Sequence, residues 1–339
     1  MRQLVNRWGK SSAIVFATVF LVMADAIFEP SALRTSALAY VWPFSAVLII
    51  AALGQTLIIQ QRGIDLSIPG YISLTAIVVT HMPNGNSSKL FESIVLIFVI
   101  NILAGLFSGL MVTKVGMSSI VQTLGMNAIL YGINIAISHG TPTQTTAALQ
   151  NFTSRSFHTI PVTFFMALLI TAVVGFVMKK TVVGRRFEAS GASDVASVAA
   201  GLRADRFQIA AYVGASILYT IAGILLAGII SQPDTFSGDA YLLSSVAAVV
   251  LGGTSLLGGT GSAVATAVGA FFLIMLQQFI LATGASAAVQ DVVEASALAV
   301  GVGIYGFRSQ SAMVVGALRQ HMNSRASRSS RSVSKMEIS

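Results

Sequence analysis

The sequence predicts an all-α, polytopic membrane protein: a helix bundle with about ten transmembrane helices. Of its 339 residues, 55% are hydrophobic and only 9% are charged, whereas a soluble domain carries about 25% charged residues. The apolar residues gather in long runs, and the abundant glycine suits close helix packing in lipid. We expect one integral membrane domain over residues 1–307 and a basic, disordered cytoplasmic tail over 308–339.

The first half contains five apolar runs. The sequence Ala24-Asp25-Ala26 resembles a signal-peptide cleavage site, but the many later spans favour an uncleaved first helix. Pro43 is expected to bend the second run near its start. The five runs cover residues 13–23, 38–59, 68–80, 94–112 and 120–137.

The second half contains five more runs, and polar loops are expected at 81–92, 138–160 and 231–240. The run at 241–251 is too short to cross a bilayer alone unless its helix extends through 252–259. The five runs cover residues 162–178, 207–230, 241–251, 263–282 and 287–307.

The basic residues predict how the chain is oriented. Ten crossings place both termini on one side. Most lysines and arginines fall on that side, at the N-terminus, Arg62, Lys114, 179–206 and the tail. The excess of positive charge in cytoplasmic loops makes this side the cytoplasm. Lys89 and Arg155 are exceptions on the outer side.

The stretch 184–206 is the longest polar interruption in the second half before the tail. It reads GRRFEASGASDVASVAAGLRADR. Val195, Val198, Ala199 and Leu202 share one side of a weak helical pattern. A short helix outside the lipid needs a protein partner for that side, so this stretch predicts a docking segment.

Asp65 lies in a short hinge, Gly63-Ile64-Asp65-Leu66-Ser67, between two apolar runs. A carboxylate at membrane depth is costly and tends to mark a pathway or a pairing site. A carboxylate at the cytoplasmic boundary would instead cap the next helix, and this interpretation is favoured. A similar segment at 253–256 suggests an internal repeat, which transporters often contain.

Uncharged polar residues inside the spans give a second set of candidates. Such residues can line a passage for a polar solute, although more often they bond to neighbouring helices. With the hinge carboxylate, the predicted translocation path comprises Asp65, Asn101, Gln122, Asn127, Thr254 and Ser255.

Several functions are not expected. The chain has no cysteine, so it offers no disulfide or thiolate. The glycine-rich stretch 252–261 lacks the Gly-Lys-Ser/Thr ending of a phosphate loop, so nucleotide binding by this chain is not expected. The four histidines are not paired at metal-ligand spacing. We therefore expect no catalytic residue, no metal, no cofactor and no nucleic-acid partner.

The stretch 184–206 resembles a known family. The residues Gly184-Arg185, Ala189, Gly191, Ala196 and Gly201-Leu202 are similar to the cytoplasmic loop in permease subunits of bacterial ABC sugar importers, in the ribose-type, monosaccharide branch. The segments 63–67 and 247–259 resemble two further motifs of the family. The resemblance extends over about residues 38–307.

The resemblance implies a multi-pass protein of the bacterial inner membrane, with both termini in the cytoplasm. The expected partners are ABC ATPase subunits that bind ATP, a periplasmic or lipid-anchored substrate-binding protein, and a second permease copy or a paralogue. Small residues let a segment lie close to an ATPase, and arginines pair with carboxylates. The implied coupling residues are Gly184, Arg185, Arg186, Ala189, Gly191, Ala196 and Gly201.

Three other functions stay open from the residues alone. A secondary transporter driven by an ion gradient would need carboxylates deep in its spans, and only Asp65 approaches that condition. An intramembrane enzyme would need a titratable or metal-binding cluster. A channel is the third alternative.

Arg62 and Pro69 stand where the family usually has glycine, so the transported sugar is not defined.

Overall fold

The computed structural model describes residues 2–286, 288–296, 298–299 and 303. Helices and their connections make up this part of the chain, apart from one short antiparallel hairpin. The helices formed by the apolar runs are α1 (Arg2–Phe28), α2 (Thr35–Gln60), α3 (Ile68–His81), α4 (Leu90–Leu110), α5 (Ser119–Ser138), α7 (Val162–Lys180), α10 (Ala204–Ile230), α11 (Tyr241–Leu251) and α12 (Ala263–Ala282). The short elements are α6 (Ala147–Ser154), α8 (Val182–Ala192), α9 (Asp194–Ala199), β1 (Ser156–Phe157), β2 (Ile160–Pro161), the 3₁₀ turns Pro30–Leu33 and Ser87–Lys89, and the π turn Met111–Val115.

The helical membrane fold is confirmed. Within the described residues, 6 helices are long and apolar enough to cross a membrane: α2, α4 with its flanking turns, α5, α7, α10 and α12. The apolar helices α3 and α11 are shorter. The last expected span, 287–307, lies partly outside the described residues, and the tail 308–339 lies wholly outside them.

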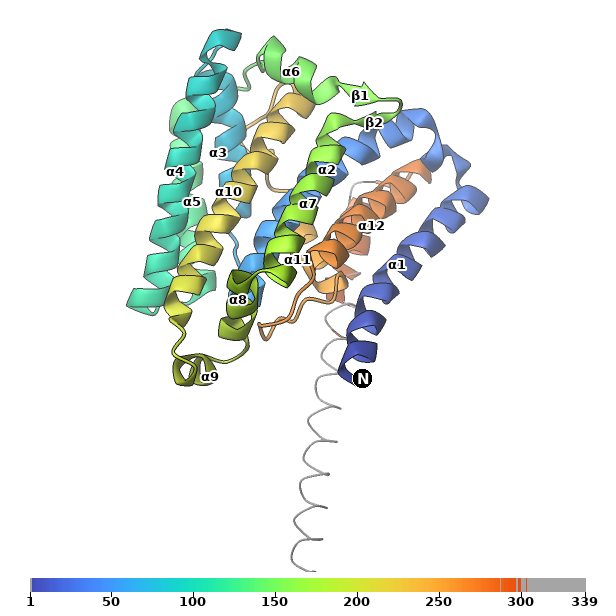
Figure 1. Cartoon of the computed structure of the whole chain (residues 1–339). Helices are drawn as coiled ribbons and strands as arrows, with labels where there is room; N and C mark the ends of the chain where they lie inside the picture. The colour runs from blue at the N-terminus through green and yellow to red at the C-terminus, as the bar shows by residue number, and fades with distance from the viewer. Residues whose placement is uncertain (1, 287, 297, 300–302, 304–339) are drawn as a thin grey trace, which may run out of the picture.

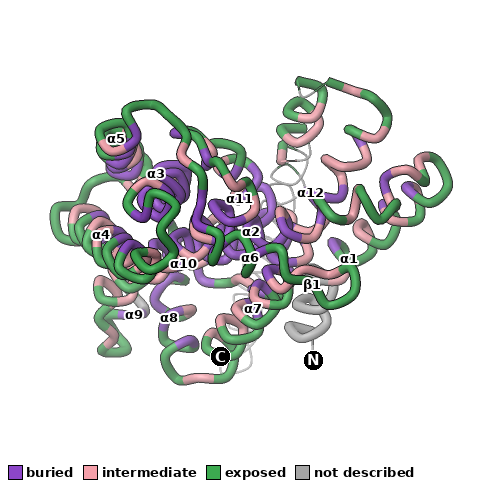
Figure 2. The backbone as a smooth tube through the Cα atoms, turned by 90° about the horizontal axis from the view of Figure 1, so that it is seen from above, coloured by how far each residue is buried: buried purple, intermediate pink, exposed green. Residues whose placement is uncertain are grey.

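Helices α2 and α3 form the buried centre of the bundle (Figure 2). Helix α10 packs along both of them, and the rings of Tyr71 and Tyr219 lie 5.7 Å apart where α3 meets α10. Helices α1, α4, α5 and α7 turn large apolar side chains outward, among them Phe16, Leu103 and Leu169. An apolar outer surface of this kind fits a lipid environment, because lipid replaces water around the bundle.

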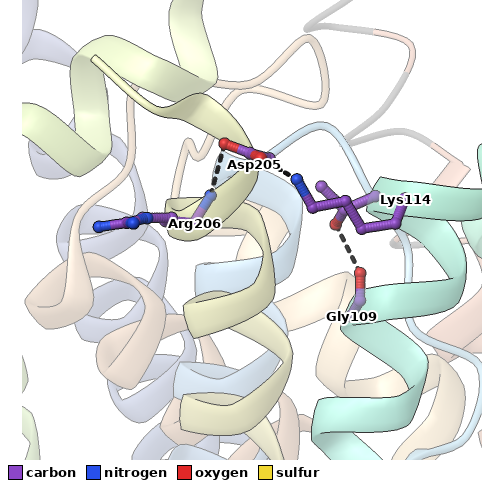
Figure 3. A network of polar contacts seen from close by, with 5 residues as sticks. Gly109, Lys114, Asp205 and Arg206 are labelled. Atoms are coloured by element: carbon purple, nitrogen blue, oxygen red, sulfur yellow. Dashed lines mark hydrogen bonds and ion pairs between the residues drawn. The ribbon is translucent and has the colours of Figure 1, made fainter.

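The bundle has two distinct ends (Figure 1). Helices α8 and α9 and the connection from α11 to α12 lie at one end, and α6 and the hairpin lie at the other. At the α8 end, Lys114 pairs with Asp205 and so joins the end of α4 to the start of α10 (Figure 3). The backbone N–H of Arg206 donates to the same carboxylate at 3.1 Å.

Some sequence-based boundaries were wrong in detail. The stretch 138–160, expected to be a polar loop, contains α6 and the hairpin, and the hydroxyl of Thr146 caps α6 by accepting from Leu149 N. The stretch 184–206 contains two helices, α8 and α9, instead of one weak pattern. The sequence left open whether the helix at 241–251 extends through 252–259, and the structure shows that α11 ends at Leu251.

A long helix followed by a non-helical segment and a short apolar helix occurs twice. In the first half these are α2, residues 61–67 and α3; in the second half they are α10, residues 231–240 and α11. The sequence instead suggested that 63–67 corresponds to 253–256, which is a different pairing of segments. The internal repeat remains a prediction.

Candidate coupling and translocation site

The inner face of α8 is seated on the bundle. Gly184, Phe187, Ser190 and Gly191 are its buried residues, and a spacing of three or four places residues on one side of a helix. Thr181 caps the helix, because its hydroxyl accepts from Gly184 N at 3.1 Å. A Cβ at Gly191 would overlap the carbonyl oxygen of α2's last residue, Gln60, so this position has room only for glycine.

The outer face of α8 carries the other expected coupling residues. Arg185, Arg186 and Ala189 are exposed, so they point away from the bundle. Ala196 belongs to α9, and Gly201 follows it with a φ of 70° and open space where a Cβ would lie. The predicted coupling residues therefore divide into a set that holds α8 and a set that a partner can reach.

Helix α9 continues this outward surface. Val195 is 82% exposed and Val198 is 71% exposed. Ala199 is also exposed, and Leu202 is half-buried. The apolar side recognised in the sequence is thus without cover at these valines in the single chain, which fits a surface that a protein partner buries.

Two glutamines that the sequence reasoning did not single out lie where α8 meets the bundle. Gln61 Nε2 donates to the carbonyl oxygen of Phe187 at 2.8 Å, and Ser190 Oγ donates to Gln61 Oε1 at 3.2 Å. The carbonyl oxygen of Gln60 accepts from Gly259 N at 2.8 Å. The sequence feature that could have identified them is a pair of glutamines directly after the apolar run 38–59.

The hinge 61–67 is non-helical backbone inside the bundle. Ser119 Oγ accepts from Ile64 N at 3.1 Å, and Thr123 Oγ1 accepts from Leu66 N at 3.0 Å. Such backbone is tolerated within a membrane protein where protein groups satisfy its donors. Ser119 and Thr123 thus belong to a polar strip along α5 that supports the hinge.

The same strip reaches the first turn of α3. Asn127 Oδ1 accepts from Gly70 N at 2.8 Å. Asp65 Oδ1 accepts from Ser67 N at 2.8 Å and also accepts a hydrogen bond from the Ser67 hydroxyl. Asp65 is only 2% exposed. Its carboxylate thus engages the residue directly before α3, from a buried position and not from an exposed boundary.

The remaining path candidates lie in several places. Asn101 Nδ2 donates to Thr75 Oγ1 at 2.9 Å and to Thr220 Oγ1 at 2.8 Å, so it joins α4 to α3 and α10. Gln122 Nε2 donates to Ser108 Oγ at 3.0 Å, between α5 and α4. These side chains make bonds between helices, and their place on a translocation path remains a prediction.

Thr254 and Ser255 lie in the connection after α11. Thr254 is buried, and its hydroxyl has no hydrogen-bond partner within the described part of the chain. Ser255 Oγ accepts from Leu257 N at 3.3 Å. Of these two, Thr254 has the side chain that a passing polar solute or a water molecule could still engage.

The second non-helical segment, 231–240, also enters the bundle. Gly238 N donates to Ser73 Oγ at 2.9 Å, which places this glycine against the first turns of α3. Asn134 Nδ2 of α5 donates to the carbonyl oxygen of Thr235 at 2.7 Å. The segment was expected to be a short polar loop, and the structure shows that it packs between α3 and α5.

Two connections at the α6 end of the bundle touch each other. Thr145 N donates to the carbonyl oxygen of Ser231 at 2.7 Å, and Gln150 Nε2 donates to Ser231 Oγ at 3.1 Å. Among the residues that the structure describes, no group of three or more His, Cys, Asp or Glu side chains could hold a metal ion. The features that this geometry offers are an exposed face on α8 and α9 and two supported interruptions of the helices.

Comparisons with known proteins agree with this architecture. The chain is 31% identical to the probable ABC transporter permease protein y4mJ of Sinorhizobium fredii over 81% of this chain and 82% of that protein. It is 27% identical to the ribose import permease protein RbsC of Haemophilus influenzae over 76% of this chain and 81% of that protein. It is 27% identical to the autoinducer 2 import system permease protein LsrC of Yersinia pestis over 81% and 78% of the two chains.

No solved structure matches the chain. A family model described as "Branched-chain amino acid transport system / permease component" matches residues 37–318. The resemblance to permeases of ABC sugar importers is confirmed. By its matched length, its helical membrane fold and its relatives, this chain belongs to that permease family.

Proposed function

We propose that the chain is the membrane subunit of an ATP-driven, binding-protein-dependent importer that carries a monosaccharide or a similar small polar solute into the cytoplasm. The observation that carries the proposal is α8, a short helix with one face fixed on the bundle and the opposite face exposed. Two relatives import ribose and autoinducer 2 according to their names, which supports a small polar solute.

The proposed energy source is an ABC ATPase that docks on the outer face of α8 and α9. Arg185 and Arg186 would pair with carboxylates of the ATPase, and the exposed valines of α9 would be buried against it. ATP would bind to and be hydrolysed by that partner, while this chain moves the solute. A second permease copy or a paralogue would complete the membrane part.

The proposed orientation places α8 in the cytoplasm of a bacterium, with the protein in its inner membrane. The basic residues of 179–206 lie at the α8 end of the bundle, as expected for cytoplasmic segments. The opposite end, with 138–160 and the start of 231–240, would then receive the periplasmic or lipid-anchored substrate-binding protein.

The proposal is tested by purifying the chain from its own cells with the proteins that accompany it and reconstituting the complex in liposomes. We expect an ATPase and a binding protein to co-purify. We also expect uptake of a labelled monosaccharide, with ribose tested first, to require ATP. Uptake by the chain alone under an ion gradient, without ATP, would support a secondary transporter instead.

The docking face is tested in the same complex by Arg185→Glu/Arg186→Glu. Reversing two charges on the outer face should lower uptake about tenfold or more, because each arginine would lose a charged partner. The amount of protein in the membrane should not change. Lys89→Glu is the control, since Lys89 is an exposed basic residue outside the α8 end. Normal uptake in the double variant would contradict ATPase docking on α8.

A further inference from the structure

The amide of Gln61 bonds to α8 with both of its polar atoms. Its nitrogen donates to the carbonyl oxygen of Phe187 at 2.8 Å, and its oxygen accepts from Ser190 Oγ at 3.2 Å. Gln61 is only 5% exposed, so neither bond is in free competition with water. Buried polar side chains are costly unless they are paired, and here the pairing fixes the amide on one face of α8.

The neighbouring residue joins a third segment to the same place. The carbonyl oxygen of Gln60 accepts from Gly259 N at 2.8 Å. A Cβ at Gly258 would lie 2.5 Å from the carbonyl oxygen of Gly191, and one at Gly259 would lie 2.8 Å from the Cβ of Ala192. The end of α2, the inner face of α8 and the connection to α12 therefore meet so closely that positions 258 and 259 have no room for a side chain. We call this contact the α8 junction.

The chain leads directly from the α8 junction into the hinge. Gln61 is the first residue after α2, and two residues of the hinge beyond it, Ile64 and Leu66, are bound through their backbone to α5. Helix α3 begins at Ile68. A displacement of α8 would therefore pull first on Gln61, and then on the non-helical backbone that precedes a short helix.

The two faces of α8 have different consequences. A partner on the outer face can push or pull the helix, and the motion reaches the end of α2 through groups on the inner face. Phe187 is buried there and packs edge-on against Phe207 of α10, with ring centroids 6.4 Å apart. Apolar packing of this kind can slide. The two hydrogen bonds of Gln61, in contrast, are directional contacts.

We propose that Gln61 is the positioning residue through which α8 moves the hinge, so that it transmits the ATP-driven motion of a bound ATPase to α3. The inference rests on the proposed function, because it supposes an ATPase on the outer face. The inference adds that the hydrogen bonds of Gln61, and not only apolar packing, determine how much solute moves for each ATP hydrolysed.

The test uses the reconstituted complex and three variants. Gln61→Met keeps an unbranched side chain of similar length but loses both hydrogen bonds. Ser190→Ala loses the bond to the amide oxygen. Gln277→Met is the matched control, since Gln277 Nε2 also donates to a side chain of a neighbouring helical segment, Glu294 Oε2 at 2.9 Å, away from the α8 junction.

The first measurement reports motion of the hinge. The chain has no cysteine, so Ile64→Cys supplies a single thiol, at a half-buried position whose backbone bond to Ser119 does not need the isoleucine side chain. We expect ATP to change the rate at which a water-soluble maleimide labels this thiol. The change should disappear when Gln61→Met is added and persist when Gln277→Met is added.

The second measurement is the amount of ribose taken up for each ATP hydrolysed. We expect a loss of about tenfold for Gln61→Met and about fivefold for Ser190→Ala, because each bond has a modest net free energy. The double variant should be no worse than Gln61→Met alone, since both changes break one contact. Additive losses would overturn the proposal, as would an ATP-dependent labelling change that survives Gln61→Met.

The outcomes separate this inference from the proposed function. If Arg185→Glu/Arg186→Glu abolishes uptake while Gln61→Met leaves labelling and uptake unchanged, the ATPase docks on α8 but Gln61 does not transmit its motion. If no ATPase co-purifies and the thiol does not respond to ATP in the parent chain, both proposals fail. If the Gln61→Met complex does not assemble, labelling and uptake are measured with Ser190→Ala, which is a smaller change at the same contact.

Discussion

The hinge 61–67 and the connection 252–261 both interrupt helices, and both meet α8, but their backbones are held in different ways. In the hinge, side chains of α5 accept from Ile64 N and Leu66 N. In the connection, most donors bond to carbonyl oxygens, among them Ser255 N to Thr260 O at 2.9 Å, and Gly259 N to the end of α2. The backbone of the hinge is thus held by side chains of another helix, whereas the backbone of the connection is held by carbonyl oxygens, with glycine at positions 258 and 259, where no side chain has room.

This difference predicts which substitutions each segment tolerates. Side-chain changes on α5 should loosen the hinge, and backbone changes at glycine should disrupt the connection. Both segments satisfy the requirement that buried backbone be bonded. The comparison can be broken if a side-chain change in the connection proves as costly as one on α5.

The largest effect is expected for Gly258→Ala. Its φ of 87° strains any other residue, by about 1–3 kcal/mol, and the new Cβ would lie 2.5 Å from the carbonyl oxygen of Gly191. We expect α8 to be displaced and uptake to be lost. Thermal unfolding of the purified protein and uptake in liposomes measure the two effects.

Gly116→Ala is the control for that experiment. Gly116 has a φ of 80° but no atom within 4 Å of a Cβ, so it isolates backbone strain from overlap with α8. It should lower stability to a similar small extent and retain uptake. Equal loss of uptake in the two variants would show that strain alone, and not the contact with α8, is responsible.

An intermediate effect is expected on the α5 side of the hinge. Asn127→Leu leaves Gly70 N without an acceptor, and Thr123→Val does the same to Leu66 N. A buried donor that loses its partner costs about 1–3 kcal/mol, which should appear as a lower unfolding temperature. Thr171→Val is the control, because its hydroxyl donates within its own helix, to Ala167 O at 2.7 Å. Equal stability of Thr123→Val and Thr171→Val would contradict the support of the hinge by α5.

The smallest effect is expected for Ser255→Ala. Its hydroxyl accepts from Leu257 N at 3.3 Å, a long bond in a segment where most donors bond to carbonyl oxygens. We expect a change in unfolding free energy of about 0.5 kcal/mol or less, because the lost bond is weak. A loss as large as that of Asn127→Leu would remove the distinction between the two segments.

The long helices were predictable because an apolar run of sufficient length has few alternatives in lipid. The run at 38–59 became Thr35–Gln60, and the run at 263–282 became Ala263–Ala282. The short elements were missed where their stability comes from elsewhere. Helix α6 packs against α10, and no pattern in 138–160 indicates that neighbour.

The candidate site was predictable only in part. The small and basic residues of 184–191 identified α8, but composition does not say which side of a short helix faces the bundle. Gln61 was passed over because its partners, Phe187 and Ser190, lie more than a hundred positions later in the chain. Hydrogen bonds over such distances depend on how the helices pack, and a single sequence carries no direct record of that.

The polar strip of α5 has one further consequence. Residues four apart on an α-helix are offset by about 40° around its axis, so Ser119, Thr123 and Asn127 follow a slow spiral. One step further along this spiral is Tyr131, which bonds to Asp239 of the second non-helical segment. The first side chains of this row thus bond to the hinge, and the last one, Tyr131, bonds to the segment 231–240. Turning α5 about its own axis would release both fastenings together.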